Sequence, residues 1–416
     1  MIRAVAAPNP PDDGRLAAVR AALPALEAGI YLNTGSVGPL PAEAAAAMAE
    51  MADYELRTGR AHPAYYEETL QRMAEARAGV AAVLTADVAD IALTHSATDA
   101  MNVGVWSVDW QPGDRAVTTN LEHPGGIGAL YNLRARSDVD LGFVDVGPER
   151  SEADVLAAFD AAIDERTRVV AVSHVLWASG TLMPLARIAE IAHTRGAILV
   201  VDGAQAVGAL PVDLAESGAD VYAVPAQKWL LGPEGMGAVA IAPRNRERLA
   251  PAFGGHLSFE TIDSSGTATW WPDARRFESS NYHRPSIVGM ARSIGWLSMF
   301  VGLDWIHERG TTLAREAARR LAAIDGVDVL TPLDRMATLV TFRIDGWAPQ
   351  AALDELSARV FAVARTVPLI EALRISVGFF NSEAELDRFI GCVELLAAHT
   401  PETVPPKRTL TILSGG

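Results

Sequence analysis

The feature that most constrains this chain is a series of short apolar runs between Tyr31 and about residue 285, separated by alanine-rich stretches. The runs are continuously apolar rather than alternating, which is typical of strands that are buried on both faces. Strands that alternate with helices predict a mostly parallel sheet with helices on both sides. We expect strands in six runs: AVTT (116–119), LGFVDV (141–146), VVAVS (169–173), AILVVD (197–202), VYAV (221–224) and GAVAIA (237–242).

A different pattern begins near residue 286. A long helical stretch leads to the β-rich run LVTFRI (339–344), a helix over 348–360 and a final helix around 382–399, which together predict a smaller α+β domain. A chain of 416 residues suits one large domain plus a smaller one. The predicted organisation is an N-terminal arm with a short helix (1–30), a large α/β domain (31–285), a small C-terminal domain (286–400) and a tail (401–416).

Charge and cysteine content narrow the function classes. The chain has 35 basic and 51 acidic residues, a formal charge of −16, which would repel nucleic acid and anionic membrane surfaces. Its one cysteine, Cys392, permits no internal disulfide and no CxxC metal or redox pair. Neither a signal-peptide core nor a run of roughly 20 apolar residues is present. We expect a cytoplasmic enzyme for a small molecule, without nucleic-acid or membrane partners and without a metal.

Three polar elements follow predicted strand ends, where parallel sheets bind ligands. Asp202 ends an apolar run, Ala97 and Thr98 begin a predicted helix, and Lys228 follows VYAVPAQ. Alone, each has an ordinary explanation: a helix-capping aspartate, a helix cap, or a lysine that extends to water. Together they supply an anion site for a phosphate, a carboxylate for a heteroaromatic nitrogen and an amine for a Schiff base. Pyridoxal phosphate (PLP) requires these parts.

Residues 201–237, VDGAQAVGALPVDLAESGADVYAVPAQKWLLGPEGMG, resemble the PLP signature of the class V aminotransferases. This group includes cysteine desulfurases, isopenicillin N epimerase-like enzymes and cysteine or cystine C–S lyases, and the likeness runs from about Tyr31 to residue 395. It implies the α/β fold type I of PLP-dependent transferases, with a mostly parallel seven-stranded type of sheet and a smaller α+β C-terminal domain. It also implies a homodimer with shared active sites.

The resemblance assigns roles to individual residues. Lys228 would attach the cofactor and move the Cα proton, while Asp202 would pair with the pyridinium nitrogen. Gln205 would lie near the phenolic oxygen of the cofactor, and His123, in LEHPGG, would stack on its ring. Arg374, in LRISVGFFNS, matches the arginine that grips the substrate α-carboxylate.

The phosphate site departs from the family pattern. Ala97 and Thr98 would hold the phosphate, but the usual histidine before the lysine is Gln227, and a usual hydroxyl residue is Ala226. The Gln227 amide can still donate a hydrogen bond. The segment RRFESSNYHRP (275–285) resembles the stretch with which a neighbouring subunit completes this site, and its donor would be Asn281.

Polar and aromatic residues elsewhere are candidates for the substrate entrance, although the aromatic ones could equally be packing residues. They come from four separate segments: Asn33, Thr34, His62, Trp177 and Tyr282.

The absence of a cysteine bears on the reaction. A desulfurase needs a nucleophilic cysteine shortly before the carboxylate-binding arginine, and FAVARTVPLIEALRIS (361–376) has none. We expect Cys392 to be a packed core thiol. The segments LEHPGG, VSHVLWASGTLMPLARI and KWLLGPEGMG resemble the C–S lyase branch, in which Trp177 stands where desulfurases carry asparagine.

The expected reaction is β-elimination from cysteine, cystine or an S-substituted cysteine conjugate, giving a thiol or persulfide, pyruvate and ammonia. The alternatives are a decarboxylation-dependent oxidative deaminase of S-cysteine conjugates, an epimerase or aminotransferase of the same fold, and a non-catalytic PLP-binding protein. All of the catalytic alternatives would use Lys228, Asp202 and Arg374.

Overall fold

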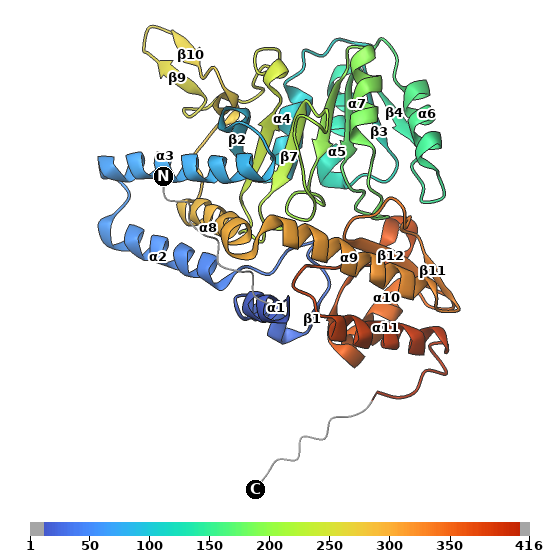
Figure 1. Ribbon diagram of the computed structural model, residues 1–416. Coiled ribbons are helices and arrows are strands. Elements are labelled where there is room, and N and C mark those ends of the chain that lie inside the picture. The colour runs from blue at the N-terminus through green and yellow to red at the C-terminus, as the bar shows by residue number, and fades with distance from the viewer. Residues whose placement is uncertain (1–11, 408–416) are drawn as a thin grey trace, which may run out of the picture.

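A seven-stranded sheet forms the centre of the computed structural model, which describes residues 12–407 (Figure 1). The strand order is β2-β8-β7-β6-β5-β3-β4, and β8 alone runs antiparallel to its neighbours. All six strands predicted from the apolar runs are present, and the short edge strand β2 makes the seventh. The strands are β2 (Ile91–Thr94), β3 (Arg115–Thr119), β4 (Asp140–Val144), β5 (Thr167–Ser173), β6 (Ile198–Asp202), β7 (Val221–Pro225) and β8 (Gly237–Ile241).

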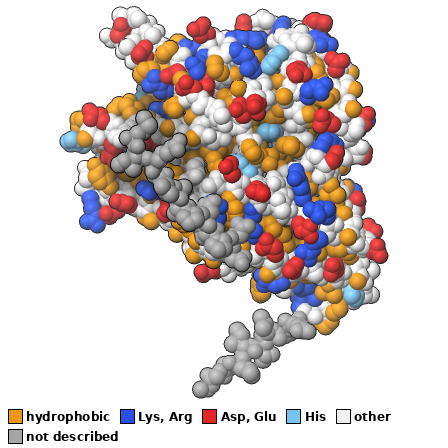
Figure 2. All heavy atoms as spheres, in the orientation of Figure 1, with side chains coloured by type: hydrophobic (Ala, Val, Ile, Leu, Met, Phe, Trp, Pro, Cys, Tyr) orange, Lys and Arg blue, Asp and Glu red, His pale blue; other side chains and the backbone are white. Residues whose placement is uncertain are grey.

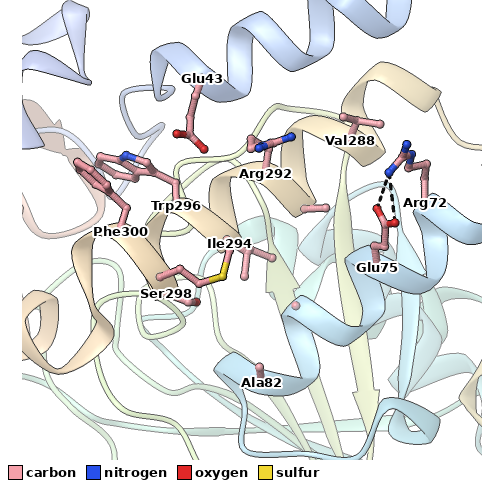
Figure 3. Close-up of a pocket in the computed structure, with 14 residues that line it drawn as sticks. Glu43, Arg72, Glu75, Ala82, Val288, Arg292, Ile294, Trp296, Ser298 and Phe300 are labelled. Atoms are coloured by element: carbon pink, nitrogen blue, oxygen red, sulfur yellow. Dashed lines mark hydrogen bonds and ion pairs between the residues drawn. The ribbon is translucent and has the colours of Figure 1, made fainter. Parts of the chain in front are cut away.

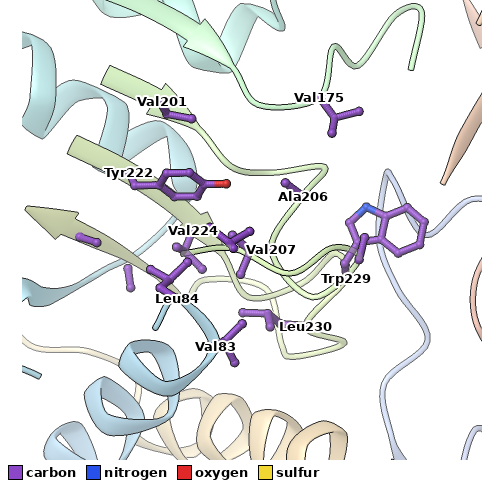
Figure 4. Packing of buried hydrophobic residues seen from close by; sticks show 14 of the residues in the cluster. Val83, Leu84, Val175, Val201, Ala206, Val207, Tyr222, Val224, Trp229 and Leu230 are labelled. Carbon is purple, nitrogen blue, oxygen red and sulfur yellow. The ribbon is translucent and has the colours of Figure 1, made fainter. Parts of the chain in front are cut away.

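Both faces of this sheet are buried, which explains why its strands are continuously apolar. In β6, Ile198 and Val200 belong to one hydrophobic cluster, while Leu199 and Val201 belong to another on the opposite face. Figure 4 shows part of the second cluster, where Tyr222 and Val224 of β7 lie near Val201. The helices that follow the strands are α4 (Ala97–Trp106), α5 (Pro124–Ser137), α6 (Glu152–Ala162) and α7 (Leu185–Thr194).

Long helices from both ends of the chain pack together beside the sheet. The helix α8 (Arg284–Gly295) contacts α2 (Ala42–Thr58) and α3 (Pro63–Val83), and continues through a π-helical turn, Trp296–Val301, to α9 (Leu303–Ala322). No single helix within residues 12–407 is long and apolar enough to cross a membrane. Only α8 and α9 taken together pass that test, and an 83° bend separates them.

The C-terminal part contains the predicted smaller α+β unit, seen at the lower right of Figure 1. Its sheet has the order β11-β12-β15-β14 and its own hydrophobic core. A two-stranded parallel pair, β1 (Ile30–Tyr31) with β13 (Ala362–Val363), joins the N-terminal segment to this part of the chain. The other elements of the unit are β11 (Val327–Val329), β12 (Leu339–Ile344), α10 (Pro349–Val360), β14 (Arg365–Val367), β15 (Ala372–Ser376) and α11 (Glu383–Ala397).

The remaining elements are peripheral. The predicted N-terminal helix is α1 (Asp12–Ala21), and β9 (Phe259–Ile262) pairs with β10 (Ala268–Trp270) in a hairpin. Figure 2 shows acidic and basic side chains interspersed over the visible face of the molecule. The predicted domain boundaries stay a prediction, and the predicted 401–416 tail lies mostly outside the described residues.

Candidate active site

A cavity of about 250 Å³ lies at the carboxyl ends of β6 and β7, where the predicted polar elements converge. The large sheet and the segments that follow its strands supply most of its wall, and the segment between β1 and α2, together with β14 and β15 of the small sheet, supplies the rest. The residues that line it are Gly35, Ser36, Ser96, Ala97, Thr98, His123, Gly125, Trp177, Asp202, Ala204, Gln205, Pro225, Gln227, Lys228, Arg365 and Arg374.

Most of the predicted site residues line this cavity, and five do not. Asn33 lies next to the wall, where its Oδ1 accepts a 2.8 Å hydrogen bond from the Ser36 hydroxyl, and Thr34 is fully buried. His62 is exposed and caps α3, accepting from Ala64 N at 3.1 Å.

Asn281 and Tyr282 lie beside a different cavity. The Tyr282 hydroxyl donates to Leu93 O at 2.5 Å, and Asn281 Oδ1 is 3.2 Å from His256 Nε2. The predicted contribution of Asn281 to the site of a neighbouring subunit stays a prediction.

Lys228 follows β7 and lines the cavity, enclosed by protein although partly exposed toward the cavity space. The pKa of its amine is lowered from 10.5 to about 8, mainly by burial; the Asp202 charge opposes this shift, and the charges of Arg374 and Arg365 contribute to it. The segment before α2 lies against this loop, because Gly38 N donates to Gln227 O at 2.7 Å. A Cβ at Gly38 would come within 2.2 Å of Lys228 O, so this close approach requires glycine. The backbone of Lys228 is therefore closely packed, and its amine is partly neutral near physiological pH.

Asp202 and His123 both lie next to the start of α5. Asp202, the last residue of β6, accepts a 2.9 Å hydrogen bond from Ala204 N through Oδ1. A Cβ at Gly126 would lie 3.1 Å from its Oδ2, so the turn of α5 packs closely on this carboxylate. His123 caps α5, with Nδ1 accepting from Gly125 N at 3.1 Å. Burial and the Lys228 charge lower the pKa of His123, which favours a neutral, stackable ring.

The N-terminus of α4 offers an anion site. Ala97 and Thr98 are its first residues, and their backbone N–H groups have no partner within the helix. Ser96 caps the helix by accepting from Asp99 N at 3.1 Å. The start of α5 packs against the same turn, since a Cβ at Gly125 would lie 2.7 Å from Thr98 Oγ1. These donors suit a phosphate group.

Arg374, on β15, is fully buried and its charge has an incomplete set of partners. Its Nη1 donates to Trp177 O at 2.7 Å, while Nε and Nη2 have no hydrogen-bond partner in the described part of the chain. Burial, and to a lesser degree Arg365, lowers the pKa of Arg374 to about 9. Gln205, which also lines the cavity, donates a 2.9 Å hydrogen bond to Gly35 O in the segment between β1 and α2. Two free donors on a buried guanidinium suit a carboxylate ligand.

The family follows from a comparison with known sequence families. Residues 30–389 match the model of the aminotransferase class-V family, which is most of the chain. The chain belongs to the class V aminotransferase family. Membership confirms the predicted family and fold type, and pyridoxal phosphate as the cofactor of an enzyme.

Relatives of this class V chain fall into several activities. It is 30% identical over 390 residues to the isopenicillin N epimerase of Streptomyces clavuligerus, covering 88% of this chain and 94% of that protein. It is 27% identical to a probable cysteine desulfurase of Methanothermobacter thermautotrophicus, with the same coverage. Among solved structures it resembles the cystine C–S lyase C-DES in complex with its product cysteine persulfide, at 26% identity and a TM-score of 0.84, covering 91% of this chain and all of that one.

The residues of this class V chain fit the cofactor. Lys228 offers an amine for attachment, Asp202 a carboxylate oxygen for the ring nitrogen, and His123 a neutral ring for stacking. Ala97 and Thr98 offer phosphate donors, so Lys228, Asp202, His123, Ala97 and Thr98 would hold it together.

One charged residue of the cavity lining in this class V chain was not predicted from the sequence. Arg365 lines the cavity from β14, donates to Ser36 Oγ at 3.2 Å and lies over the Trp177 ring, 5.3 Å from its centroid. It stands within residues 361–376, the segment that lacks a cysteine. A basic residue nine positions before Arg374 in a β-rich run was the available signal.

The predicted core thiol is confirmed. Cys392 is buried in α11 within the hydrophobic core of the small unit, and burial raises the pKa of its thiol.

Another cavity of about 620 Å³, between α2, α3 and α8, contains none of the predicted site residues (Figure 3). Arg72 and Glu75 form an ion pair at 3.0 Å at its edge.

Proposed function

We propose that this protein cleaves the Cβ–S bond of cysteine, cystine or an S-substituted cysteine by β-elimination, releasing a thiol or persulfide, pyruvate and ammonia. The observation that carries the proposal is the wall of the Lys228 cavity formed by residues 361–376. This wall contributes Arg365 and Arg374 and contains no cysteine. Relatives named as cysteine desulfurase and cystine C–S lyase support a reaction at a cysteine-type substrate.

The residues divide the work between binding and proton transfer. When bound, pyridoxal phosphate supplies an electron sink for the negative charge that develops at Cα. Arg374 would bind the substrate α-carboxylate through Nε and Nη2, and this contact would orient the amino acid within the cavity. The Lys228 amine would then remove the Cα proton. With a pKa of about 8, roughly a quarter of this amine is neutral at pH 7.5 if it is free.

The leaving sulfur has no acceptor on this chain. A persulfide-forming cysteine must be an accessible thiolate, and Cys392 is a buried thiol with a raised pKa. Sulfur would therefore leave as a thiol or as a persulfide of the substrate. This favours elimination over a desulfurase reaction.

Product analysis tests the proposal. The purified protein is incubated with PLP and with cysteine, cystine or S-methylcysteine, and the products are identified by mass spectrometry. We expect thiol or persulfide together with stoichiometric pyruvate, at equal rates in wild type and in Cys392→Ala. Carbon dioxide with an aldehyde would identify the decarboxylating deaminase instead. Loss of activity in Cys392→Ala, with the fold retained, would support a desulfurase, and the absence of turnover with any amino acid would support a non-catalytic role.

Arg365 favours a substrate whose sulfur carries a second acidic group. Its half-buried guanidinium lines the same cavity as Arg374, and burial lowers its pKa, so an anionic partner would relieve its desolvation. The second half of cystine carries a carboxylate that suits this position. Cystine would then use both arginines, whereas S-methylcysteine would use only Arg374.

We expect Arg365→Gln to raise KM for cystine by about tenfold and to leave KM for S-methylcysteine nearly unchanged. The matched control is Arg343→Gln, which removes an exposed arginine from β12 of the same sheet. Steady-state kinetics with both substrates checks the prediction. An equal loss for the two substrates would show that Arg365 acts on something common to both, such as the position of Trp177.

A further inference from the structure

Glu122 is a buried carboxyl that ties two strand ends together beside the cavity. It is 5% exposed and stands between β3 and α5. Its carboxyl accepts hydrogen bonds from Thr119 Oγ1 at 2.8 Å, from Ser173 N at 3.0 Å and from Ser173 Oγ at 2.5 Å. Thr119 is the last residue of β3 and Ser173 the last of β5, and these strands are neighbours in the sheet.

The partners of Glu122 lie directly next to two groups that face the cofactor. Ser173 is paired in register with Asp202 across β5 and β6, and the next residue, His174, donates its backbone N–H to Asp202 O at 2.9 Å. On the other side, Glu122 precedes His123 in the chain. A shift of this one carboxyl would therefore move both the end of the strand beside Asp202 and the turn that presents His123.

We propose that Glu122 is a positioning residue that sets how His123 and Asp202 approach the bound cofactor. The inference rests on PLP binding at this cavity and not on which Cα bond the protein breaks, so it goes beyond the proposed reaction. Glu122 lines no part of the cavity and would touch neither the substrate nor the cofactor. It would act through the hydrogen bonds to Ser173 and Thr119.

Charge makes this position sensitive to substitution. The pKa of Glu122 is raised to about 7, mainly by burial; the hydrogen bonds from Ser173 and Thr119 oppose this shift, and the charge of Asp202 contributes to it. Besides Glu122 and Asp202, the titratable groups in this region include His123 from the turn before α5, His174 after β5 and Lys228 after β7. His174 Nδ1 lies 2.7 Å from the Tyr222 hydroxyl. An amide at position 122 keeps the volume but cannot offer two acceptor oxygens to the Ser173 and Thr119 donors.

The test uses Glu122→Gln in the PLP-loaded protein. We expect the pH midpoint of the visible absorbance of the cofactor to move by about half a pH unit or more, and the dissociation constant of PLP to rise about tenfold. These readouts need no substrate, so they hold or fail independently of the proposed elimination. A lowered Tm with the pH midpoint and the dissociation constant unchanged would assign Glu122 a purely structural role and overturn the proposal.

Two further variants keep the test decisive. Asp220→Asn is the matched control, because Asp220 is also a buried carboxyl and accepts a 2.6 Å hydrogen bond from Leu199 N. Asp220 directly precedes β7, so it lies at the amino end of that strand, whereas the cavity lies at the carboxyl end. Asp220→Asn should lower Tm and leave the cofactor spectrum unchanged. If Glu122→Gln does not fold, Ser173→Ala removes only the hydroxyl that donates to Glu122. It should move the pH midpoint in a smaller amount, and an unchanged midpoint would overturn the proposal.

Discussion

Lys228→Ala is expected to abolish turnover, by at least about 1000-fold, because it removes the group that would transfer the Cα proton. The covalent attachment of PLP is lost as well. Borohydride reduction of the wild type followed by mass spectrometry should place the cofactor mass on the peptide that contains Lys228, and the variant should carry no such mass. Gln227→Ala is the matched neighbour: it should weaken PLP binding and retain the covalent attachment.

Lys228→Ala should not destabilise the protein in the absence of the cofactor. The pKa of Lys228 is lowered to about 8 in the folded chain, below the ordinary value of 10.5, so folding disfavours its charged form. The cost is fully present below pH 8 and disappears as pH rises to about 10.5, because only the unfolded chain binds the proton in that interval. Removing the amine should therefore leave Tm equal or higher at pH 7. A retained activity, or a clear fall in Tm, would contradict this account.

Arg374→Met is expected to lower kcat/KM by about 100-fold or more, mostly through KM. Two charge-assisted hydrogen bonds to the substrate carboxylate are lost, each contributing about 1.5 to 3 kcal/mol. Because the buried guanidinium lacks partners for Nε and Nη2, replacing it by an apolar side chain of similar length should preserve or raise the Tm of the substrate-free protein. Kinetics and thermal unfolding of the same preparations check both halves.

The exposed Arg343 of β12 provides the control for Arg374, since Arg343→Met changes the net charge equally and should leave KM unchanged. If Arg374→Met lowers Tm sharply and leaves KM intact, Arg374 supports the contact with Trp177 O and not the substrate. A loss in kcat with KM unchanged would show that Arg374 interacts with the substrate in the transition state and not in the ground state.

Much of the fold could be predicted because parallel strands buried on both faces leave a clear signature. The run 197–202 matches β6 and the run 221–224 matches β7, each to within one residue. The sequence does not show that β8 runs antiparallel to its neighbours, because a buried run looks the same in either direction. The resemblance to a family supplied the number of strands in the large sheet, whereas the smaller α+β domain was predicted from the change of pattern near residue 286.

The site was predictable where residues follow strand ends, and less so elsewhere. Asp202 and Lys228 lie at the ends of β6 and β7, where a parallel sheet binds its ligands. Arg365 carries no such mark, because it reaches the cavity from the small sheet. Glu122 does follow the end of β3, but its hydrogen bonds to Ser173, 51 residues later, appear only in the folded structure. His62 and Tyr282, which are predicted at the substrate entrance, lie outside the cavity lining.

The pairing of β1 with β13 determines when during biosynthesis the site can be completed. Ile30 pairs with Ala362, so 332 residues (362 − 30) must be added before the first strand finds its partner. At about 5 to 20 residues per second, this takes roughly 20 to 70 seconds of translation. Throughout that interval the wall formed by residues 33–38 has no C-terminal strand against which to settle. The cavity can therefore reach its final shape only after β13 has been synthesised.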